Sequence, residues 1–163
     1  MKLKHLSIVL TMLISGFIST SVNAQQKTSV IKEGVGIGKL KVGVSTKKDV
    51  EKEFGKKYKW ITNKKYSYQM TYANGVTFYI CQADIRQEIF DIEIRSPFQG
   101  KTSRGITLRQ STIEDVKKIY GTAKKGLRYQ GIEFYYQKIG GKNVVTVIDV
   151  VEKSGLRQCA ENK

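Results

Sequence analysis

The chain has 163 residues, with 29 lysines and arginines against 14 aspartates and glutamates, so its formal net charge at pH 7 is +15. This length suits one compact domain. The only histidine, His5, lies in an N-terminal segment that we expect to be removed. The mature protein would therefore have no Ser-His-Asp or Cys-His catalysis and no histidine-ligated metal site.

Residues 1–24 have the pattern of a cleaved signal peptide. Lys2 and Lys4 supply the positive end, the segment 6–18 supplies the apolar core, and small residues precede an expected cleavage after Ala24. The apolar core is too short to cross a bilayer comfortably, although an uncleaved membrane anchor is the alternative. Cleavage would leave 139 residues with a charge of +13, because two lysines leave and no acid does. We therefore expect a periplasmic or secreted protein.

The next segment, residues 25–38, is predicted to be an extended N-terminal arm. Glycines at 34, 36 and 38 alternate with other residues and favour a flexible backbone. A glycine-rich phosphate loop is the alternative. However, no strand pattern precedes these glycines, and their spacing differs from that of phosphate-binding loops. The sequence therefore favours the arm.

A stretch of 16 residues occurs twice, at 40–55 and again at 106–121. Each copy has a threonine followed three residues later by an aspartate, which is typical of a helix N-terminus. Each copy ends in a glycine, Gly55 or Gly121, a residue that favours a helix C-terminus. Apolar residues recur between these ends at helical spacing, so each copy predicts a helix of about ten residues. Helices this short must pack on other elements to be stable.

Strand patterns also recur, at 75–80 and 131–136 and again at 89–92 and 147–150, and the Asn-Gly pair at 74–75 predicts a tight hairpin. The sequence thus predicts an α+β fold in which two tandem helix-plus-antiparallel-strand repeats form one sheet with both helices on one face. The expected boundaries are repeat one at 39–95 and repeat two at 105–153, together a single domain at 39–153, and a C-terminal tail at 154–163.

The most basic part of the chain follows the first repeated stretch. Lysines alternate there with aromatic residues, a pattern suited to an acidic protein, an anionic lipid surface or stacked bases. Export argues against nucleic acid as the physiological partner. The alternative is a solvated loop that leads into an amphipathic strand. The candidate partner-binding residues here are Lys56, Lys57, Lys59, Trp60, Lys64, Lys65 and Tyr68.

Two further candidates, Tyr79 and Tyr135, take matching positions in the paired strand patterns. Their apolar neighbours at alternate positions should meet the helices, so these tyrosines should stand on the opposite, open face of the sheet. Tyrosine is favoured in binding surfaces because it is large and rigid and has a polar tip. A cross-strand aromatic pair that only supports the sheet is the alternative.

Asp91 and Asp149 also match between the two halves, and each lies between apolar residues of a strand. Two carboxylates that flank one bond could support glycoside chemistry if they faced each other within about 10 Å. Repeat symmetry explains the match without catalysis. We therefore expect no enzyme, no cofactor and no metal site.

Cys81 and Cys159 are the only cysteines, and both lie in the exported part of the chain. An even number of cysteines in an oxidising compartment predicts one structural disulfide. It would join the tail to the first hairpin and close a loop of about 78 residues, which the loop-entropy model values at about 4 kcal/mol. A catalytic redox pair would be close in sequence, and these cysteines are not.

The motif Val-Gly-Val-Ser-Thr-x-x-Asp-Val-x-x-x-Phe-Gly at 42–55, followed by aromatic-rich strands, resembles envelope modules of the BamE (SmpA/OmlA) type. The tandem duplication is also similar to the β-lactamase inhibitor protein, which has two helix-plus-sheet repeats. The resemblance covers residues 40–152 and implies a non-enzymatic protein that binds other proteins. The inhibitor presents a concave sheet face to its target, a role that would fall by position on Tyr79 and Tyr135. Unlike the BamE lipoproteins, this chain has glutamine rather than an acylatable cysteine directly after Ala24.

Together these patterns predict a non-catalytic exported binding protein. Its expected role is to block an exported enzyme or toxin through an open sheet face, as inhibitor and immunity proteins do. The charge of +13 would speed the capture of an acidic protein partner. The alternative is an envelope-maintenance or outer-membrane assembly factor whose basic segment binds anionic lipid or an assembly machine.

Overall fold

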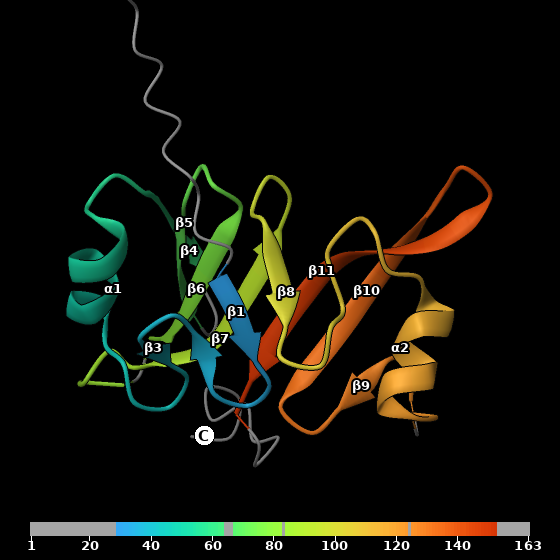
Figure 1. Cartoon of the computed structure of the whole chain (residues 1–163). Coiled ribbons are helices and arrows are strands. Elements are labelled where there is room, and N and C mark those ends of the chain that lie inside the picture. Colours follow the sequence, from blue (N-terminus) through green and yellow to red (C-terminus); the bar gives the residue numbers. More distant parts are fainter. Residues whose placement is uncertain (1–28, 64–66, 83, 124, 153–163) are drawn as a thin grey trace, which may run out of the picture.

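The structure is a computed structural model of the chain, and it describes residues 29–63, 67–82, 84–123 and 125–152 (Figure 1). This part of the chain forms two helices and eleven strands, and the strands are arranged in two sheets. Figure 1 shows the two helices at opposite ends of the molecule, with the smaller sheet between them. A single hydrophobic core receives side chains from both sheets and from both helices.

The larger sheet has seven strands in the order β4-β5-β6-β7-β11-β10-β9, and every neighbouring pair is antiparallel. The first half of the chain supplies β4 to β7 and the second half supplies β9 to β11. The two halves meet where β7 pairs with β11. The strands are β4 (Lys59–Asn63), β5 (Ser67–Thr71), β6 (Val76–Cys81), β7 (Ile89–Arg95), β9 (Arg128–Tyr129), β10 (Ile132–Ile139) and β11 (Lys142–Val151).

The smaller sheet has four short strands in the order β3-β2-β1-β8, and β1 pairs with β8 in parallel. Its side chains Ile31 and Ile37 are 0% and 2% exposed, so this sheet forms part of the core. The chain supplies it from two distant segments, the N-terminal one and the joint between the two repeated stretches. The strands are β1 (Ser29–Lys32), β2 (Gly36–Ile37), β3 (Leu40–Lys41) and β8 (Gly100–Thr102).

The expected fold, two tandem helix-plus-antiparallel-strand repeats on one sheet, is wrong. The described chain is mostly β, and its two sheets have four and seven strands. The difference begins in the segment expected to be a flexible arm, which forms β1 and β2 and packs into the core. Its alternating glycines make tight turns: Gly36 has a φ of +146°, and a Cβ there would lie 2.0 Å from the Leu40 carbonyl oxygen. Glycine is therefore needed at this position for close strand approach, not for flexibility.

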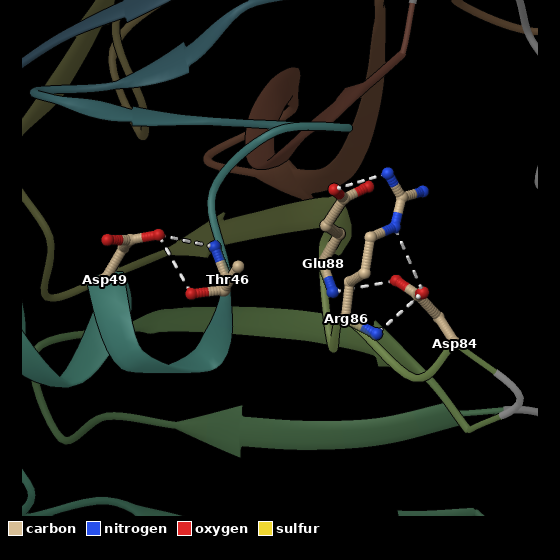
Figure 2. A network of polar contacts seen from close by, with 5 residues as sticks. All are labelled: Thr46, Asp49, Asp84, Arg86 and Glu88. Atoms are coloured by element: carbon tan, nitrogen blue, oxygen red, sulfur yellow. Dashed lines mark hydrogen bonds and ion pairs between the residues drawn. The ribbon is translucent and has the colours of Figure 1, made fainter.

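Both predicted helices are confirmed, as α1 (Lys47–Phe54) and α2 (Ile113–Tyr120). The Asp49 carboxylate accepts hydrogen bonds from the Thr46 backbone N–H at 2.8 Å and from its hydroxyl at 2.9 Å (Figure 2). Asp115 makes the same two contacts at the start of α2, at 2.8 and 3.0 Å. These contacts stabilise the first turn of each helix. Neither described helix has the length and apolar character that crossing a membrane requires.

Candidate functional site

The larger sheet has one face in the core and one polar face. In β6 the side chains of Val76, Phe78 and Ile80 are fully buried in the core, and the alternate positions point to the other side. The helices and the smaller sheet contribute to the core side. On the other side, Thr77, Asp91, Glu133 and Asp149 are 7–9% exposed. We call this second side the polar face. Its residues are Thr77, Tyr79, Asp91, Glu93, Glu133, Tyr135 and Asp149.

Three acids of the polar face form one row across neighbouring strands. Glu93 of β7 is the register partner of Asp149 of β11, which is in turn the partner of Glu133 of β10. Asp91 lies two residues before Glu93 on the same face of β7, so it is diagonal to Asp149. Like charges directly opposite one another in a sheet are destabilising. Such a row therefore needs either compensating cations or a reduced charge.

Two arginines compensate part of this charge. Arg95 holds both carboxylate oxygens of Glu93, with Nε–Oε1 at 2.6 Å and Nη2–Oε2 at 2.8 Å. Arg128 Nε lies 3.1 Å from Glu133 Oε2. Both arginine side chains are about half exposed, at 56% and 50%, so the two pairs border the row from the solvent side. The hydrogen bonds and ion pairs of these two arginines go to Glu93 and Glu133, and not to Asp149, the middle acid.

Asp149 is the least compensated acid of the row. Its side chain is 7% exposed, and its Oδ1 is buried without a hydrogen-bond partner. Burial raises the pKa of Asp149 to about 8, and the negative charges of Asp91, Glu93 and Glu133 add to this effect, whereas Arg95 opposes it. At neutral pH most molecules therefore carry a protonated Asp149. Burying either the ionised or the protonated carboxyl group costs free energy when no hydrogen-bond donor pairs with it.

The two predicted tyrosines border this row. The Tyr79 hydroxyl donates to Glu93 Oε2 at 3.4 Å, and the Tyr135 hydroxyl donates to Glu133 Oε2 at 3.0 Å. Burial and the nearby carboxylates raise the pKa of both phenols, which therefore stay neutral donors. Two strands, β7 and β11, lie between them, so they do not form the cross-strand aromatic pair that was the alternative. Their role in binding stays a prediction.

The other predicted site residues lie in a different place. Trp60 of β4 and Tyr68 of β5 stack with ring centroids 5.0 Å apart, and the Lys47 ammonium lies 5.8 Å from the Trp60 ring centroid. The register partners of Trp60 are Met70 and then Phe78, which are core residues, so this cluster lies on the core side of the sheet. The exposed lysines nearby are Lys56 and Lys57, which precede β4, and Lys59. Lys59 alternates with Trp60 and is in register with Thr71 and Thr77, so it lies on the polar-face side of β4. We call this cluster the basic edge: Lys47, Lys56, Lys57, Lys59, Trp60 and Tyr68.

The structure thus separates the predicted aromatic residues: Tyr79 and Tyr135 lie on the polar face, whereas Trp60 and Tyr68 lie on the core side of the sheet. Lys64 and Lys65 lie outside the described residues. Cys81 is disulfide-bonded, and its expected partner Cys159 also lies outside the described residues, so their pairing stays a prediction. The sequence interpretation missed four residues of the polar face and its border: Glu93, Arg95, Arg128 and Glu133. The alternation of Asp, Glu and Arg with isoleucine at 91–95 was the signal that could have found two of them.

Comparison with known proteins identifies no relative: no family model, no curated protein and no solved structure matches the chain. The resemblance to BamE and inhibitor modules therefore stays a prediction. Within the described ranges, no group of three or more acidic, histidine or cysteine side chains is placed to hold a metal ion.

Proposed function

We propose that this protein is a non-catalytic exported binding protein that uses the polar face to block another protein, as an inhibitor or immunity protein does. The observation that carries the proposal is the placement of Tyr79 and Tyr135 on either side of an acidic row, on the sheet face opposite the core. Backbone pairing fixes these side chains relative to one another. A rigid surface with aromatic anchors loses little conformational entropy when it binds.

The shape of the surface also favours a protein partner. Small molecules bind in clefts and cavities that cover most of their surface. Surface cavities of about 350, 240 and 430 Å³ are present, but their linings share no residue with the polar face. The diagonal placement of Asp91 and Asp149 brings together the two carboxylates considered for catalysis. Their place on a sheet face, among tyrosines and arginines, suits recognition of a surface.

Affinity capture with a double variant tests the proposal. The mature, oxidised protein would be immobilised and exposed to secreted and envelope fractions at low and high salt, and retained proteins would be identified by mass spectrometry. We expect a single protein to be retained at high salt, and we expect Tyr79→Ala with Tyr135→Ala to weaken its binding at least tenfold. Tyr136→Ala is the matched control, because Tyr136 is 50% exposed in the same strand as Tyr135. Wild-type affinity in the folded double variant would remove the polar face as the binding surface.

A second candidate function is favoured by the basic edge. Trp60 is 39% exposed and lies among exposed lysines, a combination suited to the headgroup region of an anionic membrane. The protein would then be an envelope-maintenance or assembly factor. Flotation with phosphatidylglycerol vesicles and with phosphatidylcholine vesicles tests this role. Selective flotation with the anionic vesicles supports it, and equal flotation with both, or with neither, removes it.

A further inference from the structure

We infer that the polar face receives an arginine side chain of the partner protein, whose guanidinium pairs with Asp149 between Glu93 and Glu133. This inference rests on the proposed function and adds the chemistry of the partner at the same face. It also differs from the charge argument, which predicts an acidic partner for a protein of formal charge +13 after cleavage. The contact surface and the net charge have opposite signs, and contact chemistry determines which group fits.

The first step of the argument is the incomplete pairing within the row. Arg95 is committed to both oxygens of Glu93, and Arg128 lies against Glu133. The two outer acids of the row, Glu93 and Glu133, are therefore each paired with an arginine. The middle acid, Asp149, is paired with neither of these arginines. A cation placed between these pairs would complete an alternation of charge along the row.

The second step is independent of the acidity of the cluster. Asp149 Oδ1 is buried and has no hydrogen-bond partner, on a side chain that is 7% exposed and faces acids on both neighbouring strands. Buried polar atoms without partners are rare in folded proteins, and each one needs an explanation. A donor supplied by a partner explains this one, because the unpaired oxygen would then be satisfied in the complex.

The third step concerns the type of cation. The described residues offer no metal-binding group at this face or elsewhere. A guanidinium has five N–H donors in a planar fork, so it can bond to two carboxylates at once and stack on an aromatic ring. Tyr79 and Tyr135 supply aromatic surface at either end of the row while their hydroxyls bond to Glu93 and Glu133. This combination favours arginine over the compact ammonium of lysine.

Binding should be coupled to loss of a proton. The pKa of Asp149 is about 8, so a guanidinium that pairs with the ionised form displaces the proton that Asp149 carries at neutral pH. Apparent affinity should then rise about tenfold per pH unit between pH 6 and pH 8 and level off above that range. The groups that face Asp149 from the neighbouring strands are Tyr79, Asp91, Glu93, Arg95, Arg128, Glu133 and Tyr135.

Nuclear magnetic resonance titration of the mature, oxidised protein tests the inference. The probe is N-acetyl-arginine amide, and N-acetyl-citrulline amide is the matched neutral probe of nearly the same shape. We expect the arginine probe to shift backbone resonances of β7, β10 and β11 with a dissociation constant that falls about tenfold from pH 6 to pH 7. We expect no such shifts with the citrulline probe. Equal binding of both probes, or of N-acetyl-lysine amide as well as the arginine probe, would overturn the assignment to a guanidinium.

Two variants connect this binding to the acidic row. Asp149→Asn should weaken binding of the arginine probe at least tenfold at pH 8 and abolish its pH dependence, and Glu133→Gln should weaken binding without abolishing that dependence. Glu114→Gln, at an exposed acid of α2, should bind as the wild type does. Thermal melts establish that each variant is folded. Wild-type binding and pH dependence in Asp149→Asn would overturn the inference.

The inference can fail separately from the proposed function. Suppose that a captured protein partner is lost in the tyrosine double variant but is unaffected by Asp149→Asn and by excess arginine probe. The polar face would then remain the binding surface, and the arginine chemistry would be wrong. If neither set of variants changes capture, both proposals are wrong.

Discussion

The polar face and the basic edge place opposite charges in opposite environments. The acids of the polar face lie on central strands, where Asp91, Glu133 and Asp149 are only 7–9% exposed. Three of the four lysines of the basic edge, Lys56, Lys57 and Lys59, are exposed on or beside β4, an outer strand of the sheet. Charges in a buried row interact strongly and unfavourably, whereas solvated charges are screened and contribute little to stability.

This difference determines what each region says about function. A solvated, lysine-rich surface has little effect on the stability of the fold, so its presence alone does not identify a site. A row of buried acids with an unpaired oxygen lowers the stability of the fold, and such features concentrate at functional sites. The polar face is therefore the stronger candidate.

The largest expected effect comes from replacing Asp149 with asparagine. The pKa of this carboxyl group is raised from 3.8 to about 8, so the folded protein binds a proton more tightly than the unfolded chain does. Its contribution to stability is present below about pH 4 and is lost as the pH rises through 8. We expect Asp149→Asn to be more stable than the wild type by about 5 kcal/mol at pH 8 and nearly equal to it at pH 4.

Urea unfolding of both proteins at pH 4, 6 and 8 measures this difference. Glu114→Gln is the control, because it removes an exposed acid from α2 and should change the free energy of unfolding by less than about 0.5 kcal/mol at each pH. If the difference in the free energy of unfolding between Asp149→Asn and the wild type does not grow with pH, Asp149 is solvated and its pKa is not raised.

The next largest effect is expected from Arg95, on the same face and with the opposite sign. Arg95→Gln removes two charge-assisted hydrogen bonds to Glu93 and leaves the acidic row with one cation fewer. We expect a loss of about 1.5 kcal/mol in the free energy of unfolding at pH 7, a value reduced because the Arg95 side chain is 56% exposed.

Arg86 provides the matched comparison. Its guanidinium lies 3.6 Å from Asp84 and 3.1 Å from Glu88, and its side chain is 68% exposed (Figure 2). Arg86→Gln should change the free energy of unfolding by less than about 0.5 kcal/mol, because exposed ion pairs contribute little. If the two arginine variants lose equal stability, the acidic row is not a special environment.

The helices could be predicted from the sequence because their signals are local. Thr46 and Asp49 lie three residues apart and bond to each other at the helix start, and Gly55 closes the same helix with a φ of +83°. The smaller sheet could not be predicted in this way. Ile31 pairs with Ile37 on one side and with Thr102 on the other, and nothing in a two- or three-residue strand indicates so distant a partner.

The polar face could be predicted only in part. Alternation with buried neighbours placed Tyr79 and Tyr135 on the side away from the core, and repeat symmetry singled out Asp149. Glu93 and Glu133 were missed because they have no acidic counterparts at matching positions in the other half. Their meeting with Asp149 depends on the pairing of β7 with β11 and of β11 with β10, which the sequence does not specify.

A smaller effect is expected at the basic edge. Trp60→Ala removes an aromatic stack with Tyr68 and the contact of the Lys47 ammonium with the indole ring. We expect a loss of about 1 kcal/mol in urea unfolding, because Trp60 is still 39% exposed. Ile119→Ala is the control, since Ile119 is equally exposed but lies on α2. A loss above about 3 kcal/mol would mean that Trp60 belongs to the core rather than to a surface cluster.

The smallest effect on stability is expected from neutralising the lysines of the basic edge. Changing Lys56, Lys57 and Lys59 together to glutamine should alter the free energy of unfolding by less than about 0.5 kcal/mol, because all three side chains are exposed. Any flotation with anionic vesicles should nevertheless be lost, since that binding depends on charge. Urea unfolding and flotation of the same variant measure the two effects.

At the basic edge, stability and binding should thus be independent. At the polar face they should move in opposite directions, because Asp149→Asn is expected to gain stability while it loses the arginine probe. If the triple lysine variant keeps its vesicle binding, charge is not what holds the protein to the membrane, and only the polar face retains a physical argument for a site.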